Sequence, residues 1–376
     1  MKTLKIIRNS LAVGLMLLAS TLQAQYNTNP TLKIGDDAPP IIVQSWVKGE
    51  PIHQFEKGKV YVIDFWATWC GGCIASFPHI SAVAEKYKGK VRFASIDSYE
   101  GLGDRKDEDA AVVVKDFLKT SKGQRLKLDV AVDDKANTMY NTWIKTLRRQ
   151  GFPTTFIIDQ NGKIAWVDAN LDNLDWVLQQ VLSKKWNNET ARQVMTLRDA
   201  LDDKFIATVR NEVQDQKNSY LEMIDDAEAF EKQFPDRKYE VAFYKLWAFT
   251  EIDKGKVPML LEEMALNPRS KYINLGDAAF LSLRRDDLTK RDYIAIAKVQ
   301  ERLLLNEHNG TGHGGKSVEA YSELAATYSK AGNISKAIFS IQIAIAMAKE
   351  QKVPANDIEV LTATMSKYKS TKTDLN

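Results

Sequence analysis

Between residues 33 and 183, short apolar runs alternate with longer stretches in which apolar residues recur at helical spacing. The run Val60–Trp66 is apolar at almost every position, which indicates a buried strand. Further extended segments are expected at 91–96 and 126–132, and helices at 73–87, 109–119, 139–147 and 171–182. Strands that alternate with helices predict an α/β fold, a central mixed sheet covered by helices on both faces.

Two pairs of short strands are separated by turn residues, and each pair predicts a hairpin. The first pair, at 41–46 and 51–55, surrounds Lys48-Gly49-Glu50 and is expected at an edge of the sheet. The second pair, at 154–158 and 163–167, surrounds the turn Asp159–Gly162. The hairpin and the helix that follows it would complete the first domain.

From about Lys184 onward only helical periods remain. They are separated by residues that interrupt helices: Phe234-Pro235, Gly255, Asn267-Pro268, the 308–315 stretch, Gly332 and Pro354. A chain of 376 residues can form two cores. The expected organisation is therefore an α/β domain over 25–187 and an all-helical domain of helical hairpins over 188–376.

One stretch of the second domain, Tyr321–Ala344, is similar in spacing to a tetratricopeptide unit. It departs from that repeat at Tyr321, where Trp is usual, and at Lys349, where Pro is usual. A helical hairpin whose small residues merely allow close packing accounts for the pattern equally well. Both interpretations stay open.

The first 24 residues have the pattern of a secretory signal peptide. An apolar stretch, Leu11–Ala19, follows three basic residues and precedes a small residue, Ala24. That stretch is short for a bilayer span, so a retained membrane anchor is the weaker alternative. Cleavage removes three positive charges and no acid, which takes the net charge from +3 to about 0. We expect an exported, periplasmic protein that is soluble after cleavage, and the charge gives no reason to expect nucleic acid binding.

The only two cysteines, Cys70 and Cys73, lie between the Val60–Trp66 strand and the next helix. At a helix N-terminus, free backbone N–H groups and the helix dipole favour the thiolate, which is the form that attacks disulfides. A structural bridge is a weaker explanation, because so short a loop constrains the unfolded chain little. A zinc site would need a second pair of ligands. The pattern therefore favours redox chemistry by the dithiol itself, with no metal and no other cofactor.

Two motifs together, Asp64–Cys73 and Gly151–Phe156, resemble the signature of the exported TlpA/ResA-like thiol–disulfide oxidoreductases of the thioredoxin superfamily. The resemblance covers about 33–183 and implies a thioredoxin fold with a redox disulfide Cys70–Cys73. It implies that Cys70 attacks the substrate and that Cys73 resolves the mixed disulfide. Pro153 would be cis beside the cysteines, leaving the Phe152 backbone free to pair with an extended substrate. The alternative for Pro153 is a trans proline that begins a strand.

Two acids enter the expected site through the same resemblance. Asp64 occupies the position of the buried acid of thioredoxins, where burial raises the carboxyl pKa and lets it accept the Cys73 proton. The alternative is an Asp that faces solvent. Glu100, just after the 91–96 strand, corresponds more loosely to a glutamate that ResA-like proteins place near the cysteines.

Four residues are expected to contact the substrate: Trp69, Gly71, Gly72 and Phe152. Trp69 would provide an apolar docking surface, whereas Trp66 fits the core better. The Gly71-Gly72 pair offers only backbone to the Cys70 thiolate, which indicates a reducing or intermediate potential, although the direction of electron flow stays open. The expected partners are disulfide-bearing or dithiol client proteins and, for a reductant in an oxidising compartment, a transmembrane thiol carrier.

The segment Gly310–Ser317 satisfies the P-loop pattern, but the residues before it read as a helix rather than the required strand. We therefore expect no nucleotide binding. Two rival functions remain beside protein-disulfide exchange. One is a helical binding protein that uses the first domain as an inert scaffold. The other is a thiol peroxidase, although the chain lacks a Pro-x-x-x-Thr-x-x-Cys arrangement.

Overall fold

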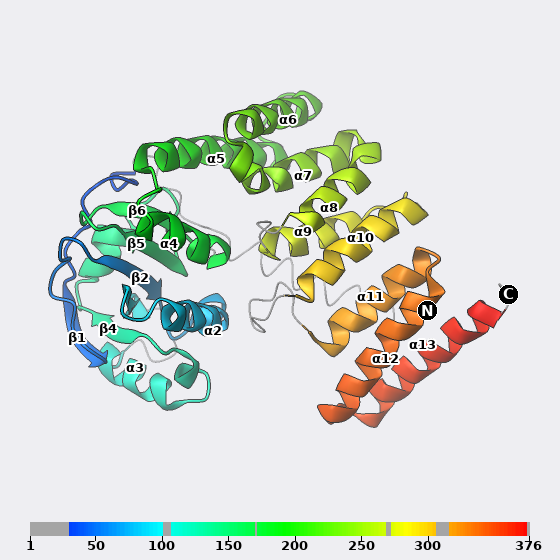
Figure 1. Cartoon of the computed structure of the whole chain (residues 1–376), viewed down its shortest axis with the longest axis horizontal. Helices are drawn as coiled ribbons and strands as arrows, with labels where there is room; N and C mark the ends of the chain where they lie inside the picture. The colour runs from blue at the N-terminus through cyan, green and yellow to red at the C-terminus, as the bar shows by residue number, and fades with distance from the viewer. Residues whose placement is uncertain (1–29, 101–106, 170, 268–271, 306–315, 374–376) are drawn as a thin grey trace. The chain divides into compact units, whose positions relative to one another are not determined.

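The computed structural model describes residues 30–100, 107–169, 171–267, 272–305 and 316–373 (Figure 1). It divides into two compact units, Met1–Arg192 and Gln193–Asn376. The expected signal peptide, residues 1–24, lies outside the described residues. Among the helices of the described part, none is both long and apolar enough to span a membrane.

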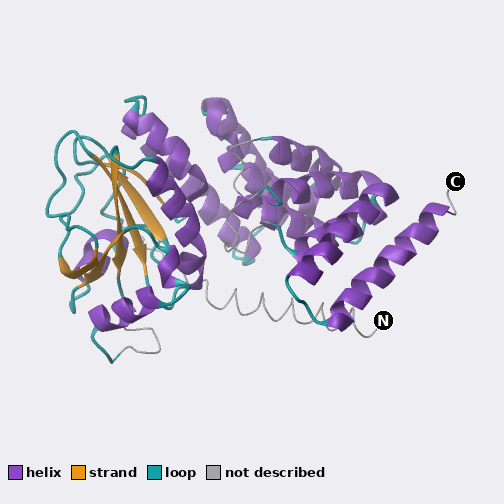
Figure 2. Ribbon diagram, turned by 60° about the horizontal axis from the view of Figure 1, so that its bottom comes forward, coloured by secondary structure: helices purple, strands orange, loops and turns teal. Residues whose placement is uncertain are grey.

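The first unit is built on one mixed sheet of six strands (Figure 2). The strands are β1 (Val43–Lys48), β2 (Val60–Trp66), β3 (Val91–Asp97), β4 (Asp129–Asp133), β5 (Thr154–Ile158) and β6 (Ile164–Asp168), in the spatial order β1-β4-β3-β2-β5-β6. Strands β2, β3 and β4 are mutually parallel, so their carboxyl ends share one edge of the sheet. Strands β1, β5 and β6 run antiparallel to their neighbours. This is the thioredoxin-like fold that the sequence predicts.

Strand β2 is buried on both faces, and its alternating side chains divide the first unit into two cores. Val62 and Trp66 face the core made with α2 (Gly71–Lys86), α3 (Ala110–Lys119) and α4 (Leu174–Leu182). Ile63 and Phe65 face the opposite core, which contains the π-helix η3 (Tyr140–Ile144). Side chains of β2 at even positions therefore lie on the same face of the sheet as α2.

The hairpin predicted at 41–55 is wrong. Strand β1 pairs antiparallel with β4, far away in sequence, and residues 51–55 form no strand. Ile52 is nevertheless buried and packs with Phe55 in the core on the η3 face. The apolar residues of this segment reflect burial of an irregular stretch. The second predicted hairpin is confirmed as β5–β6, where Gly162 adopts a positive φ of 77° in the turn.

The second unit is helical throughout its described residues. Its helices are α5 (Asn188–Val209, which begins in the first unit), α6 (Gln216–Gln233), α7 (Ala242–Ile252), α8 (Val257–Leu266), α9 (Tyr272–Leu283), α10 (Lys290–Leu303), α11 (Val318–Lys330), α12 (Ile334–Glu350) and α13 (Ala355–Thr373). Several begin at side chains that cap free backbone N–H groups, including Asp215, Thr289, Ser317 and Asn333. The predicted boundary at 187/188 falls at the start of α5, and it stays a prediction.

Helices α11 and α12 form a packed hairpin over the tetratricopeptide-like stretch. Leu324 and Tyr328 of α11 pack with Ala337 of α12. Ala325 packs with Ile341 in a neighbouring cluster. Small residues thus allow close approach of the two helices, while assignment to the tetratricopeptide family stays a prediction. Most of the P-loop-like segment lies outside the described residues, and its last residue, Ser317, caps α11.

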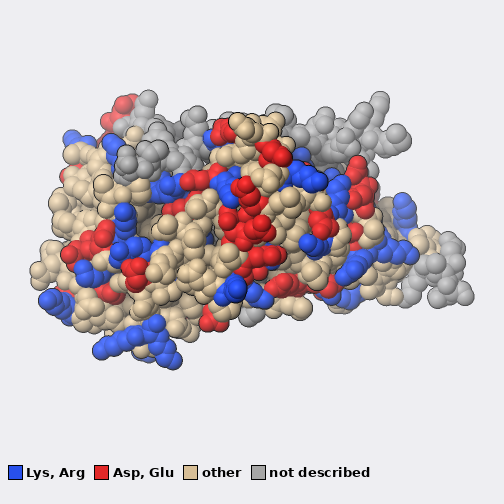
Figure 3. Space-filling view, turned by 90° about the horizontal axis from the view of Figure 1, so that it is seen from above, with Lys and Arg blue, Asp and Glu red and all other residues tan. Residues whose placement is uncertain are grey.

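The face of the molecule seen in Figure 3 carries both acidic and basic side chains, and acidic ones gather near its centre. This distribution agrees with the near-zero net charge expected for the chain after residue 24. It offers no support for a nucleic acid interface on that face.

Candidate functional site

The two cysteines lie where β2 passes into α2, and they are joined in a disulfide with a sulfur–sulfur distance of 2.06 Å. Cys70 is the N-cap of α2, and its Sγ accepts a hydrogen bond from the Cys73 backbone N–H at 3.2 Å. The same N–H and the positive end of the helix dipole would stabilise a Cys70 thiolate after reduction. Cys70 is 7% exposed and Cys73 1%, so Cys70 is the more accessible of the two residues.

Pro153 lies beside the loop that separates the cysteines. The Phe152–Pro153 peptide bond is cis, as the resemblance implied. A Cβ placed on Gly72 would lie 3.8 Å from Cδ of Pro153, whereas one on Gly71 would meet nothing within 4 Å. The proline ring therefore packs near the second glycine, and the first glycine borders open space.

Asp64 is buried, so the alternative of a solvent-facing Asp is wrong. Its even position in β2 directs it to the α2 face, the side of the sheet on which Cys73 is buried. Its Oδ1 accepts a hydrogen bond from the Thr155 hydroxyl at 2.7 Å, and its Oδ2 accepts one from the Ser95 hydroxyl at 3.0 Å. Burial raises the pKa of Asp64 to about 7, against the opposing effect of these two hydrogen bonds.

Glu100 is also buried, and it holds the segment that leads into the cysteines. Its Oε1 accepts from the Thr68 backbone N–H at 2.6 Å, and its Oε2 accepts from the Thr68 hydroxyl at 2.7 Å. Thr68 precedes Cys70 by two residues. The structure therefore places Glu100 against the cysteine loop, joined to it through Thr68.

The family model described as AhpC/TSA matches residues 34–167. FixW of Rhizobium leguminosarum is 29% identical over 172 residues, which are 46% of this chain and 75% of the relative. The thiol-disulfide oxidoreductase ResA of Bacillus cereus is 30% identical over 155 residues, 41% of this chain and 77% of the relative. The chain belongs to the ResA-like thiol–disulfide oxidoreductases.

A solved structure, titled as a putative protein disulfide isomerase from Bacteroides thetaiotaomicron, matches the chain at 22% identity. It covers 41% of this chain and 92% of that one, with a TM-score of 0.33. The AhpC/TSA match, residues 34–167, lies within the first unit and contains both cysteines.

Four aromatic side chains connect in series beside the ResA-like cysteine pair. Trp69 is 39% exposed, and its ring centroid lies 6.0 Å from that of Phe152. The Phe152 ring lies 5.9 Å from Tyr140, which in turn stacks on Tyr99 at 4.7 Å. The Trp69 indole N–H donates to the Tyr99 carbonyl at 3.2 Å. Trp66, by contrast, is fully buried against Phe77 and belongs to the core.

Several residues of this ResA-like site were missed by sequence reasoning. Ser95 and Thr155 face Asp64 from the two strands beside β2. Their even spacing from the apolar residues of their own strands could have placed them on the α2 face, but only the cross-strand register brings them opposite Asp64. Tyr99 and Tyr140 carry no sequence signal, since their contact depends on a positive φ of 63° at Tyr99 and on the π-helix.

Proposed function

We propose that the chain is an exported protein-disulfide reductase that uses Cys70 and Cys73 as its redox pair. The observation that carries the proposal is the Cys70–Cys73 disulfide at the start of α2, with buried Asp64 on the same face of the sheet. The ResA relative supports the same reaction class. A chain that used this unit only as a scaffold would not need the cysteines, the buried acid and the cis proline together.

The reaction begins with the reduced protein. The Cys70 thiolate attacks one sulfur of the client disulfide, forms a mixed disulfide and releases the other client sulfur as a thiolate. Asp64, ionised, accepts the proton of the Cys73 thiol, and the Cys73 thiolate then attacks Sγ of Cys70. The two client sulfurs leave as thiolates and take up two protons, one held by Asp64 and one from water, so the two-electron reduction of the client equals the oxidation of the protein to the Cys70–Cys73 disulfide. A pKa of about 7 suits Asp64 to this transfer near neutral pH.

The client is an extended segment held beside the cysteine pair. The Phe152 backbone next to the cis proline supplies main-chain pairing, and the half-exposed Trp69 supplies apolar contact. Gly71 and Gly72 keep the approach to Cys70 free of side chains. Glu100 acts through Thr68 by fixing the loop that positions Cys70.

The direction we propose is reduction of the client. The Gly71-Gly72 loop carries no charged or imidazole group that would strongly stabilise the Cys70 thiolate, a feature that separates it from strong oxidants. In an oxidising compartment, the Cys70–Cys73 disulfide must be reduced again after each reaction with a client. This need implies a transmembrane thiol carrier as partner. The helical unit selects or holds the client and takes no part in the chemistry.

The test is trapping of the mixed disulfide. Cys73→Ser should accumulate a covalent complex with a disulfide-containing client such as insulin, because the resolving thiol is missing. Cys70→Ser should trap almost none, and the double variant serves as the control. Equal trapping by both single variants would contradict the assignment of roles. Consumption of hydrogen peroxide faster than of peptide disulfides would favour the thiol peroxidase instead.

A further inference from the structure

A strongly acidic pocket of about 350 Å³ lies at the carboxyl ends of β3 and β4. Because β2, β3 and β4 are parallel, the carboxyl end of β2, which leads to Cys70, lies at the same edge of the sheet. Seven of the fourteen residues that line the pocket are Asp or Glu, and one, Lys135, is basic. The carboxyl edge of a parallel sheet is the usual position of ligand sites in such folds.

The pocket shares a wall with the loop that carries Cys70. Glu100 lines the pocket and accepts both hydrogen bonds of Thr68. Tyr99 also lines it, and its carbonyl accepts from the Trp69 indole. Thr68 and Trp69 are the two residues immediately before Cys70. A client segment held at Cys70 therefore passes next to the residues that form this wall.

Asp97, the last residue of β3, is the buried acid of the pocket. The Thr68 backbone N–H lies near enough to lower its pKa, but that N–H donates its hydrogen bond to Glu100. Asp97 is 0% exposed, and neither of its carboxylate oxygens accepts a hydrogen bond within the described residues. Asp133, in the same pocket, differs because the Ser98 hydroxyl and the backbone N–H groups of Met139 and Tyr140 donate to it. An ionised Asp97 therefore has no donor of its own, which is costly for a buried carboxylate, and the pocket offers space for one.

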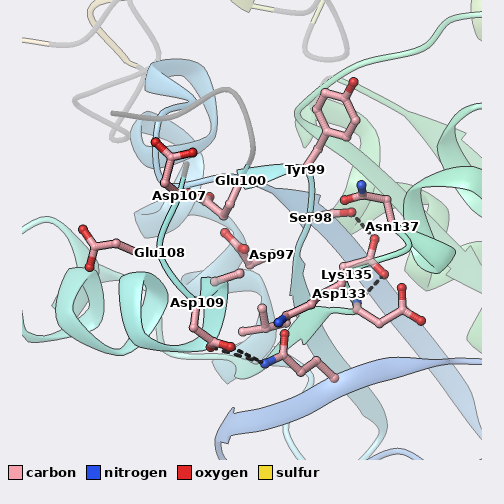
Figure 4. A pocket seen from close by; sticks show the side chains of 14 residues that line it. Asp97, Ser98, Tyr99, Glu100, Asp107, Glu108, Asp109, Asp133, Lys135 and Asn137 are labelled. Atoms are coloured by element: carbon pink, nitrogen blue, oxygen red, sulfur yellow. Dashed lines mark hydrogen bonds between the residues drawn. The ribbon is translucent and has the colours of Figure 1, made fainter. Parts of the chain in front are cut away.

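The surroundings of Asp97 favour a positive partner (Figure 4). Asp97 lies between Glu100 and Asp109 in that view, with Asp133 across the pocket. Burial first, and then the negative charge of Glu100, raise the pKa of Asp97 well above its ordinary value. When Asp97 is protonated, it can donate a hydrogen bond to Glu100, and this bond raises the pKa of Asp97 further. A cation that enters the pocket can replace this proton and supply the missing donors.

We propose that the pocket binds the cationic end of a Lys or Arg side chain that lies near the client cysteine attacked by Cys70. An ammonium group offers three N–H donors and a guanidinium group five, both without an acceptor. Such a group matches the two empty acceptors of Asp97 and the negative lining. The inference rests on the proposed function, since it names the class of client segment that the reductase prefers.

Two synthetic peptides with one disulfide each, identical except for Lys or Gln beside one cysteine, provide the test. The reduced full-length protein should reduce the Lys peptide with a kcat/KM about tenfold higher than the Gln peptide. Asp97→Asn should bring this ratio close to one, since the amide keeps the shape and loses the negative charge. The matched control is Glu85→Gln on α2, an exposed acid paired with Lys88, which should keep the full ratio.

Each outcome separates the inference from the proposed function. Reduction of both peptides at equal rates by the unaltered protein would overturn the pocket as a client site and leave the reductase proposal standing. Reduction of neither peptide would overturn the reductase proposal. If Asp97→Asn still prefers the Lys peptide, the preference arises from charge elsewhere in the protein, and the inference about Asp97 is overturned. If that variant does not fold, Asp107→Asn, at an exposed position of the pocket, should lower the ratio, and an unchanged ratio would overturn the inference.

Discussion

The Thr155 hydroxyl donates a hydrogen bond to Oδ1 of Asp64 at 2.7 Å, between two residues 91 positions apart. This bond favours the ionised carboxylate and lowers the pKa of Asp64, in opposition to burial. Thr155→Val should therefore raise that pKa above about 7 and move the resolution of mixed disulfides to higher pH. The rate of resolution measured against pH checks this, with Thr142→Val, an exposed hydroxyl, as the control. A pH profile that does not move would contradict the role of Asp64 as the proton acceptor.

The stability of the oxidised protein should depend on pH through the same acid. The pKa of Asp64 is about 7 in the folded protein, against an ordinary value of 3.8. Between these values the folded state holds the extra proton, so the free energy of unfolding falls as the pH rises through this range. Asp64→Asn lacks this titrating group. Its free energy of unfolding should therefore rise relative to that of the parent by up to about 4 kcal/mol when the pH is raised from 4 to 8. Urea unfolding at both pH values measures it, and a constant difference would refute the prediction.

Glu100→Gln should loosen the loop before Cys70. The amide can accept only one of the two hydrogen bonds that Thr68 now donates, and its NH₂ group faces the other donor. We expect a loss of about 1–3 kcal/mol in the free energy of unfolding, the range for an unsatisfied buried group. The change should also lower the rate of mixed disulfide formation. An unaltered unfolding midpoint and rate would show that Thr68 needs no such anchor.

The reduction potential of the Cys70–Cys73 pair should lie nearer to that of thioredoxin, about −270 mV, than to that of DsbA, about −120 mV. The reason is the uncharged Gly71-Gly72 loop, which stabilises the Cys70 thiolate through backbone alone. Equilibration with glutathione buffers measures the potential. A value above about −150 mV would reverse the direction we propose.

The position of a cut between the two units should matter for stability. Asn188 donates to Asp159 at 3.3 Å, and Arg192 donates to the Ile34 carbonyl at 3.0 Å, so the first turn of α5 is bonded to the first unit. A piece that spans 25–192 should therefore resist urea better than one that spans 25–187. Both should reduce insulin at close to the rate of the whole chain. Loss of folding in both pieces would mean that the two units depend on a shared core.

The part of the fold that the sequence predicts is the part encoded by local patterns. The apolar run of β2, the turn before β6 and the helix after Cys73 each carry their signal within a few residues. The pairing of β1 with β4 does not, because the choice of partner depends on contacts across about 85 residues of sequence. The irregular stretch around Ile52 shows that a pattern of apolar positions can predict which residues are buried. The same pattern does not predict whether the segment pairs with another strand.

The candidate site divides in the same way. Cys70, Cys73, Asp64 and Pro153 belong to two motifs that can be recognised in a single sequence. The hydroxyls that hydrogen-bond Asp64 come from two other strands, and only the register of the sheet brings them opposite it. Asp97 lies two residues after Ser95 in an ordinary strand pattern. Its lack of a partner becomes visible only when every donor around it has been placed.

The chain contains only two cysteines, and the structure joins them to each other. As the chain folds, no wrong internal pairing can form, so the molecule needs no disulfide shuffling to reach its native state. In the purified protein every thiol belongs to Cys70 or Cys73. A simple thiol count, zero or two per molecule, therefore reports which fraction of the molecules is reduced.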